Sequence, residues 1–167
     1  MHITIFRRRF TPWGVDGTMV IDGFFFCGTV EHPKKFLPAG HYKIALVPIR
    51  IQQGKEEIRT MPTILPVKGR VSKKSVLRKP YLKPGFGPFA LKYGSIVMGK
   101  SLKTGLVAYS EEKFQEFCDM ISDALLKKEK VTLVIKDWEK DDIPKEYMIV
   151  LPTNTSANNT PANNNLK

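Results

Sequence analysis

The stretch Gly94-Ser95-Ile96-Val97-Met98-Gly99-Lys100-Ser101 (GSIVMGKS) matches the phosphate-loop pattern G-x-x-x-x-G-K-S/T letter for letter. A phosphate loop needs small residues, so that its backbone N–H groups can wrap the phosphates, and a helix that begins at the Lys-Ser pair. Here three of the four interior residues are bulky and apolar, and Gly105 interrupts any helix that follows. The stretch therefore predicts a short buried strand over 95–98 that Gly99 ends, and not a nucleotide-binding loop.

The sequence around this stretch favours strands with a single helix. β-forming residues are concentrated at 3–10, 18–22, 24–31, 42–51, 131–135 and 147–151. Asp22-Gly23 lies between two apolar runs and predicts a hairpin, so the first 51 residues read as an antiparallel meander. Apolar residues at three- and four-residue spacing predict one amphipathic helix that begins at Ser110, whose hydroxyl would cap it: Phe114, Phe117, Cys118, Ile121 and Leu125.

These elements predict a mainly β (α+β) fold, an antiparallel meander or small barrel-like domain with the helix packed on it. We expect one β-rich domain over residues 1–151. Five prolines and four glycines over 52–90 predict short extended pieces and a loop excursion. Residues 152–167 are rich in Asn and Thr and predict a flexible tail.

The net charge of +11 comes from one segment. Residues 58–110 contain no Asp or Glu and 11 of the 27 basic residues, and elsewhere the basic residues equal the 16 acidic ones in number. Residues 111–146 are mildly acidic. Such asymmetry favours an anionic partner. The sequence predicts an interaction surface on the excursion: Lys68, Arg70, Lys73, Lys74, Arg78, Lys79 and Lys83.

Aromatic residues interleave with this basic stretch: Trp13, Tyr81, Phe86, Phe89 and Tyr93. Aromatics with cations can stack on nucleic-acid bases or anchor a protein interface. Arg7-Arg8-Arg9 is a second basic element. Strand alternation would place Arg7 and Arg9 on one face and Arg8 on the other, at an exposed edge or interface or at a phosphate.

Cysteine and histidine spacing gives no metal motif, and we expect neither a metal nor a cofactor. Cys27 could act as a nucleophile with His32 or His41, but a small buried residue in an aromatic strand is the favoured interpretation. Cys118 is expected in the core. No apolar run is long enough to span a membrane, and the N-terminus does not resemble a signal peptide.

Four motifs in order carry a family resemblance: Thr18–Gly23 (TMVIDG), Cys27–Glu31 (CGTVE), Pro38–Lys43 (PAGHYK) and Gly94–Gly99 (GSIVMG), followed by Ser110. Over about residues 1 to 136 the chain resembles a family of small phage and bacterial domains of unknown function, which are similar to L,D-transpeptidase catalytic domains. The resemblance implies a site in which a cysteine thiolate attacks an acyl group and a histidine acts as its base.

This chain departs from that site. The position of the cysteine holds Ser95, and no histidine follows His41. A serine without a base is a poor nucleophile. We therefore expect a catalytically degenerate member, with Ser95 as a vestigial position and no enzymatic activity.

The sequence thus predicts a non-enzymatic structural or interaction protein. The resemblance implies a phage virion component, such as a ring, neck or tail-associated subunit, located in the virion if phage-encoded and otherwise cytoplasmic. Its expected partners are copies of itself or other virion proteins, with no membrane and no small-molecule substrate. One alternative is a peptidoglycan-acting transpeptidase-like enzyme with an altered site at Ser95. Another is a nucleic-acid-binding module that uses residues 68–83.

Overall fold

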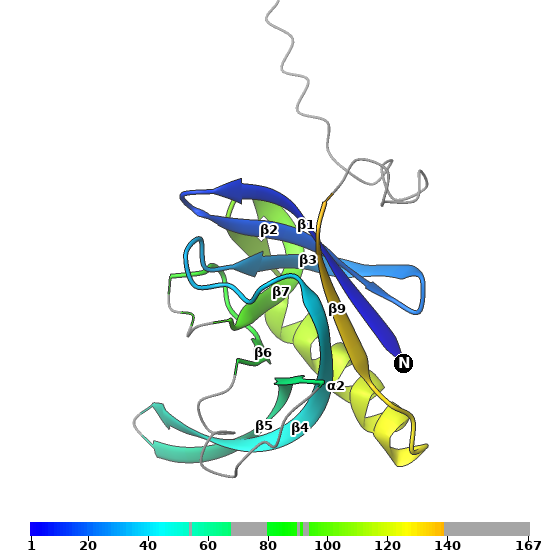
Figure 1. Cartoon of the computed structure of the whole chain (residues 1–167). Coiled ribbons are helices and arrows are strands. Elements are labelled where there is room, and N and C mark those ends of the chain that lie inside the picture. Colours follow the sequence, from blue (N-terminus) through cyan, green and yellow to red (C-terminus); the bar gives the residue numbers. More distant parts are fainter. Residues whose placement is uncertain (54, 68–79, 90, 92–93, 139–167) are drawn as a thin grey trace, which may run out of the picture.

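The computed structural model describes residues 1–138 apart from 54, 68–79, 90 and 92–93 (Figure 1). This part of the chain forms nine strands and one helix. The elements are β1 (His2–Thr11), β2 (Gly14–Ile21), β3 (Phe24–Glu31), β4 (Gly40–Gln53), β5 (Lys55–Pro66), β6 (Leu82–Lys83), β7 (Ile96–Lys103), β8 (Leu106–Ala108), α2 (Ser110–Leu126) and β9 (Thr132–Asp137).

The strands form one strongly curved sheet in the order β5-β4-β9-β1-β2-β3-β7-β6, with β8 paired to β7 (Figure 1). The two ends of this order approach each other, because Thr63 in β5 forms a bridge with Tyr81, next to β6. The N–H of Ile64 also donates to the carbonyl of Pro80 at 2.8 Å. The sheet is thus a nearly closed barrel, and the predicted mainly β fold with one helix is confirmed.

The predicted meander holds for β1, β2 and β3, which pair in sequence and antiparallel. The turn between β2 and β3 is the predicted Asp22-Gly23 pair, and both residues have positive φ, as a tight hairpin turn requires. The meander prediction is wrong for β4. β4 pairs with β5 on one side and with β9 on the other. β9 in turn pairs with β1 in parallel, so β9 lies between β1 and β4.

The prediction of loops over 52–90 is wrong for residues 55–66, which form the long strand β5 against β4. Pro62 is compatible with the strand because its backbone nitrogen faces away from β4. The N–H of Ile64 points away from β4, toward Pro80, and Pro62 has the same parity along the strand. The N–H that Pro62 lacks would therefore not have bonded to β4.

The stretch GSIVMGKS lies in strand β7 from Ile96 onward, as predicted for a strand, and no helix begins at Lys100. The strand is longer than predicted, however. Gly99 does not end it, because Gly99 pairs with Gly28 of β3 and the next residue pairs with Ala108 of β8. The pattern match therefore lies inside a sheet.

Helix α2 is amphipathic, as predicted, and its inward side chains join the main core. Phe114, Phe117 and Ile121 are buried among side chains of the strands, Cys118 is half-buried, and Leu125 is exposed. Among the residues that the structure describes, no helix combines the length and the apolar character that crossing a membrane requires.

Several predictions lie outside the described residues. These are the strand over 147–151, the tail over 152–167, the domain boundary at 151, and six of the seven basic residues of the predicted surface: Lys68, Arg70, Lys73, Lys74, Arg78 and Lys79. The seventh, Lys83, lies in β6 and is partly buried.

Candidate interaction surface

Ser95, the position of the nucleophile implied by the family resemblance, is buried immediately before β7. Its hydroxyl accepts a hydrogen bond from the backbone N–H of Tyr81, with 3.3 Å between nitrogen and oxygen. The side chain therefore links the segment before β6 to the start of β7. This contact gives Ser95 a structural role in closing the barrel.

The two cysteines are held as neutral thiols. Cys27 is buried opposite Met19, and burial raises the pKa of its thiol to about 12. Cys118 is half-buried, and burial raises its pKa to about 11. Since the thiolate is the reactive form, both side chains are poor nucleophiles at neutral pH. His32, one of the two predicted partners of Cys27, instead packs its ring edge-on to Phe89.

The three consecutive arginines do not alternate as predicted. A β-bulge lies between Arg7 and Arg9, because Arg7 pairs with Gly17 and Arg9 with Asp16. The extra residue, Arg8, is half-buried over the ring of Trp138. The bulge breaks the two-residue period, and Arg7 is buried whereas Arg9 is exposed, so the prediction that these two arginines lie on one face is wrong.

Arg7 is one of the most deeply buried side chains, with 1 % of its surface exposed. Its guanidinium forms a two-pronged ion pair with the equally buried Glu31, with both N–O distances at 2.8 Å. It also donates to the carbonyl of Leu37 at 2.5 Å and to Asp137 at 3.3 Å. Burial opposes the charge, but the bonds to both carboxylates outweigh it and raise the pKa of Arg7. This cluster ties β1, β3 and β9 together.

Large apolar side chains are exposed where three turns meet at one end of the barrel. They are Trp13 (65 % exposed) from the β1–β2 turn, Phe86 (78 %) and Phe89 (66 %) from the segment after β6, and Leu106 (44 %) from the β7–β8 turn. We call these four residues the end surface. Trp13, Phe86 and Phe89 were singled out in the sequence, whereas Leu106 was not.

Hydrogen bonds and close backbone contacts hold the three turns together. The N–H of Gly105 donates to the carboxylate of Asp16, near the start of β2, at 2.8 Å, and the N–H of Val107 donates to the carbonyl of Phe86 at 3.0 Å. Gly105 has φ +75°, and a Cβ there would lie 2.5 Å from the carbonyl oxygen of Trp13. Only glycine allows this approach. The end surface therefore belongs to a braced part of the fold.

Exposed cations surround the end surface. Arg9 donates to the hydroxyl of Thr104 at 2.8 Å, in the turn that precedes Leu106. Lys34 and Lys35 follow His32, which contacts Phe89, and together they lower the pKa of that histidine in addition to the effect of its burial. Lys103 pairs with Leu106 across the β7–β8 turn. None of the four cations forms an ion pair with another described residue.

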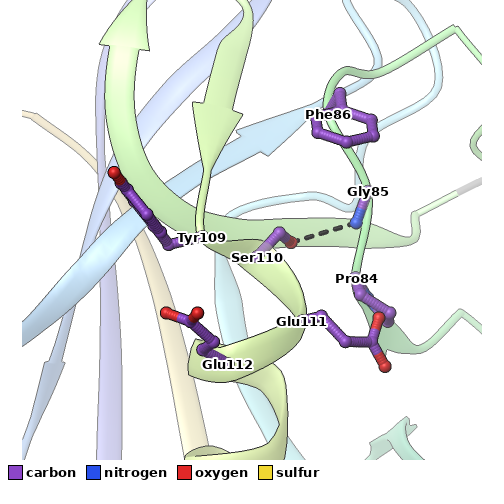
Figure 2. A pocket seen from close by; sticks show the side chains of 7 residues that line it. All are labelled: Pro84, Gly85, Phe86, Tyr109, Ser110, Glu111 and Glu112. Carbon is purple, nitrogen blue, oxygen red and sulfur yellow. Dashed lines mark hydrogen bonds between the residues drawn. The ribbon is translucent and has the colours of Figure 1, made fainter.

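A shallow groove of about 350 Å³ opens beside Phe86 (Figure 2). Its walls are mostly apolar and come from the segment after β6 and the first turn of α2: Pro84, Gly85, Phe86, Tyr109, Ser110, Glu111 and Glu112. Figure 2 shows Phe86 and Tyr109 on opposite sides of Ser110, with both carboxylates on the helix below. These carboxylates disfavour an anion in the groove.

Ser110 does not cap α2, contrary to the prediction. The residue that precedes the helix is Tyr109, which has the left-handed φ of 49°, and no side chain caps the first turn. The hydroxyl of Ser110 instead donates to the carbonyl of Met98 and accepts the N–H of Gly85 at 3.0 Å (Figure 2). It therefore binds the groove wall to β7.

The chain matches no protein-family model, no curated protein and no solved structure. Among the described residues, no three His, Cys, Asp or Glu side chains are close enough together to hold a metal ion.

Proposed function

We propose that this protein is a non-enzymatic structural protein that assembles with other copies of itself or with other proteins through the end surface. The observation that carries the proposal is that Trp13, Phe86, Phe89 and Leu106, all exposed, lie on three turns that hydrogen bonds and close backbone contacts hold together. Contiguous apolar side chains with a polar rim are typical of protein interfaces.

The chemistry of the end surface supports binding to a protein. Aromatic side chains on a braced scaffold lose little conformational freedom on binding, because their few torsions are already restricted. The surrounding cations Arg9, Lys34, Lys35 and Lys103 add charge that attracts and orients an acidic partner. The resemblance to phage-encoded domains leads us to propose a virion component as the setting.

The alternative of a transpeptidase-like enzyme at Ser95 is less well supported. The hydroxyl of Ser95 is buried and already accepts a hydrogen bond from Tyr81. An acyl donor would have to enter the core to reach it. Cys27 is also buried, and burial raises the pKa of its thiol to about 12, so the reactive thiolate is disfavoured at neutral pH.

Two experiments test the proposal. The first incubates the full chain, Ser95→Ala and Cys27→Ala with peptidoglycan fragments and an activated acyl donor, followed by intact-mass analysis. We expect no adduct and no turnover. An adduct or turnover that either substitution abolishes would identify an enzyme.

The second experiment measures incorporation of the protein into the particle or complex that contains it naturally, by quantitative mass spectrometry of size-fractionated material. We expect the wild-type chain at fixed stoichiometry and loss of the Trp13→Ser/Phe89→Ser variant. The matched control replaces exposed apolar residues away from the end surface, Phe24→Ser/Phe25→Ser. Equal incorporation of both variants would refute a role for the end surface.

A further inference from the structure

We infer that the end surface of one copy docks on the outward face of α2 in a second copy. This inference rests on the proposed function, and it names the partner: the protein itself, bound through an acidic helix. The contact joins two different surfaces of the protein, one from each copy.

The outward face of α2 carries four exposed carboxylates, which we call the acidic helix face: Glu112, Glu116, Asp119 and Asp123. At about 100° per residue, these four side chains fall within about 60° of arc, opposite the buried residues Phe117 and Ile121. They therefore point away from the core together.

The acidic helix face has few partners inside the molecule. Glu116 pairs with Lys113 at 2.6 Å, and Asp119 accepts from the amide of Gln115 at 3.0 Å. Glu112 and Asp123 form no ion pair with another described residue. A cluster of like charges on one helix costs free energy that a cationic partner would remove.

The two surfaces are complementary in charge and in apolar content. The end surface has Arg9, Lys34, Lys35 and Lys103 beside it, and none of these four forms an ion pair with another described residue, although Arg9 is attracted to the carboxylate of Asp16. The acidic helix face ends at Leu126, which is 82 % exposed, and Met120 lies beside it. Leu126 and Met120 therefore provide apolar surface against which the aromatic residues of the end surface can pack.

The surroundings of the end surface favour a protein over a nucleic acid. Glu112 lines the groove beside Phe86 and forms no ion pair with another described residue, so its carboxylate would repel phosphates. The other carboxylate of the groove, Glu111, is paired with Arg59. Because the two docking surfaces are unlike, a contact between them leaves each copy with one free surface of each kind. Such a contact adds further copies and closes into a ring where the rotation between copies allows.

Two charge-reversal variants test this contact in the full chain. Lys34→Glu/Lys103→Glu reverses the rim of the end surface, and Asp119→Lys/Asp123→Lys reverses the acidic helix face. The control, Lys43→Glu/Lys136→Glu, makes the same charge change at two exposed lysines elsewhere. Circular dichroism confirms that each variant folds. Native mass spectrometry and light scattering measure the assembled mass at low ionic strength and in about 1 M salt, where charge interactions are screened.

We expect the wild-type chain and the control to assemble at low salt and both reversal variants to be monomers. An equal mixture of the two reversal variants should assemble again, because the intact helix face of one meets the intact end surface of the other and the two reversed surfaces are also opposite in charge. Trp13→Ser/Phe89→Ser should also be monomeric, and salt should weaken every assembly.

Three results would overturn the inference. One is a wild-type chain that stays monomeric at every concentration and salt. Another is assembly that neither reversal variant changes. The third is a monomer that binds a single-stranded oligonucleotide through Lys34 and Lys103. If the wild-type chain is monomeric but still enters its natural particle through the end surface, the proposed function stands and the inference about the partner fails.

Discussion

The protein places charge in two contrasting ways. Around Arg7, every nitrogen of the guanidinium has a partner within the chain, from Glu31, Leu37 and Asp137, and both Arg7 and Glu31 are fully buried. Around the end surface, Arg9, Lys34, Lys35 and Lys103 are exposed and form no ion pair with another described residue. Charges matched inside the chain stabilise one fold, whereas unmatched charges beside exposed aromatics remain available to another molecule.

The largest expected effect comes from breaking the interior cluster. Arg7→Met leaves Glu31 buried without its cation, and we expect it to lower the free energy of unfolding by about 3–5 kcal/mol. Urea denaturation measures the change. The double variant Arg7→Met/Glu31→Leu should recover most of the loss, because it removes both buried charges.

The matched control for this substitution is Arg9→Met at the end surface. Its exposed guanidinium contacts only the hydroxyl of Thr104 among the described residues, so we expect a change within about 0.5 kcal/mol. Equal costs for Arg7→Met and Arg9→Met would contradict the distinction between the two regions.

A smaller effect is expected where the groove joins the sheet. Ser110→Ala removes two hydrogen bonds and leaves the carbonyl of Met98 and the N–H of Gly85 without that partner. We expect a loss of about 1–3 kcal/mol in the free energy of unfolding. Ser101→Ala, on an exposed part of β7, is the control and should be near neutral. A neutral Ser110→Ala would show that this hydroxyl contributes no net stability.

The smallest effect on folding is expected at the end surface itself. Phe86→Ser and Phe89→Ser should change the free energy of unfolding by no more than about 0.5 kcal/mol, because both rings are exposed. Phe117→Ala, in the core, should cost about 3–5 kcal/mol in the same urea experiment. A large decrease in the free energy of unfolding for Phe86→Ser or Phe89→Ser would mean that these aromatic side chains stabilise the fold, which would contradict their assignment to a binding surface.

Local patterns in the sequence predict the local structure well. The Asp22-Gly23 hairpin follows from turn chemistry, and α2 follows from apolar spacing, since each depends on residues close in sequence. Strand β5 and the position of β9 could not be predicted in this way. Their pairing depends on strands that are distant in the sequence. Prolines predict loops, but Pro62 fits in β5 because its backbone nitrogen faces away from β4.

The same limit applies to the sites. The burial of Arg7 depends on partners 24 and 130 residues away, and no local pattern shows them. Trp13, Phe86 and Phe89 were recognised as candidate contacts, but they were grouped with the basic stretch 68–83. The cations beside them among the described residues come from three other segments, which no local pattern brings together.

The position of β9 has a consequence for synthesis of the chain. This strand is the last described along the sequence, yet it joins β1 to β4 in the middle of the sheet. While residue 131 is leaving the ribosome, β1 and β4 each present an open backbone edge that only later residues can fill. Exposed edges of this kind invite wrong pairing between nascent chains. The sheet can therefore be completed only once β9 is available to pair with both β1 and β4.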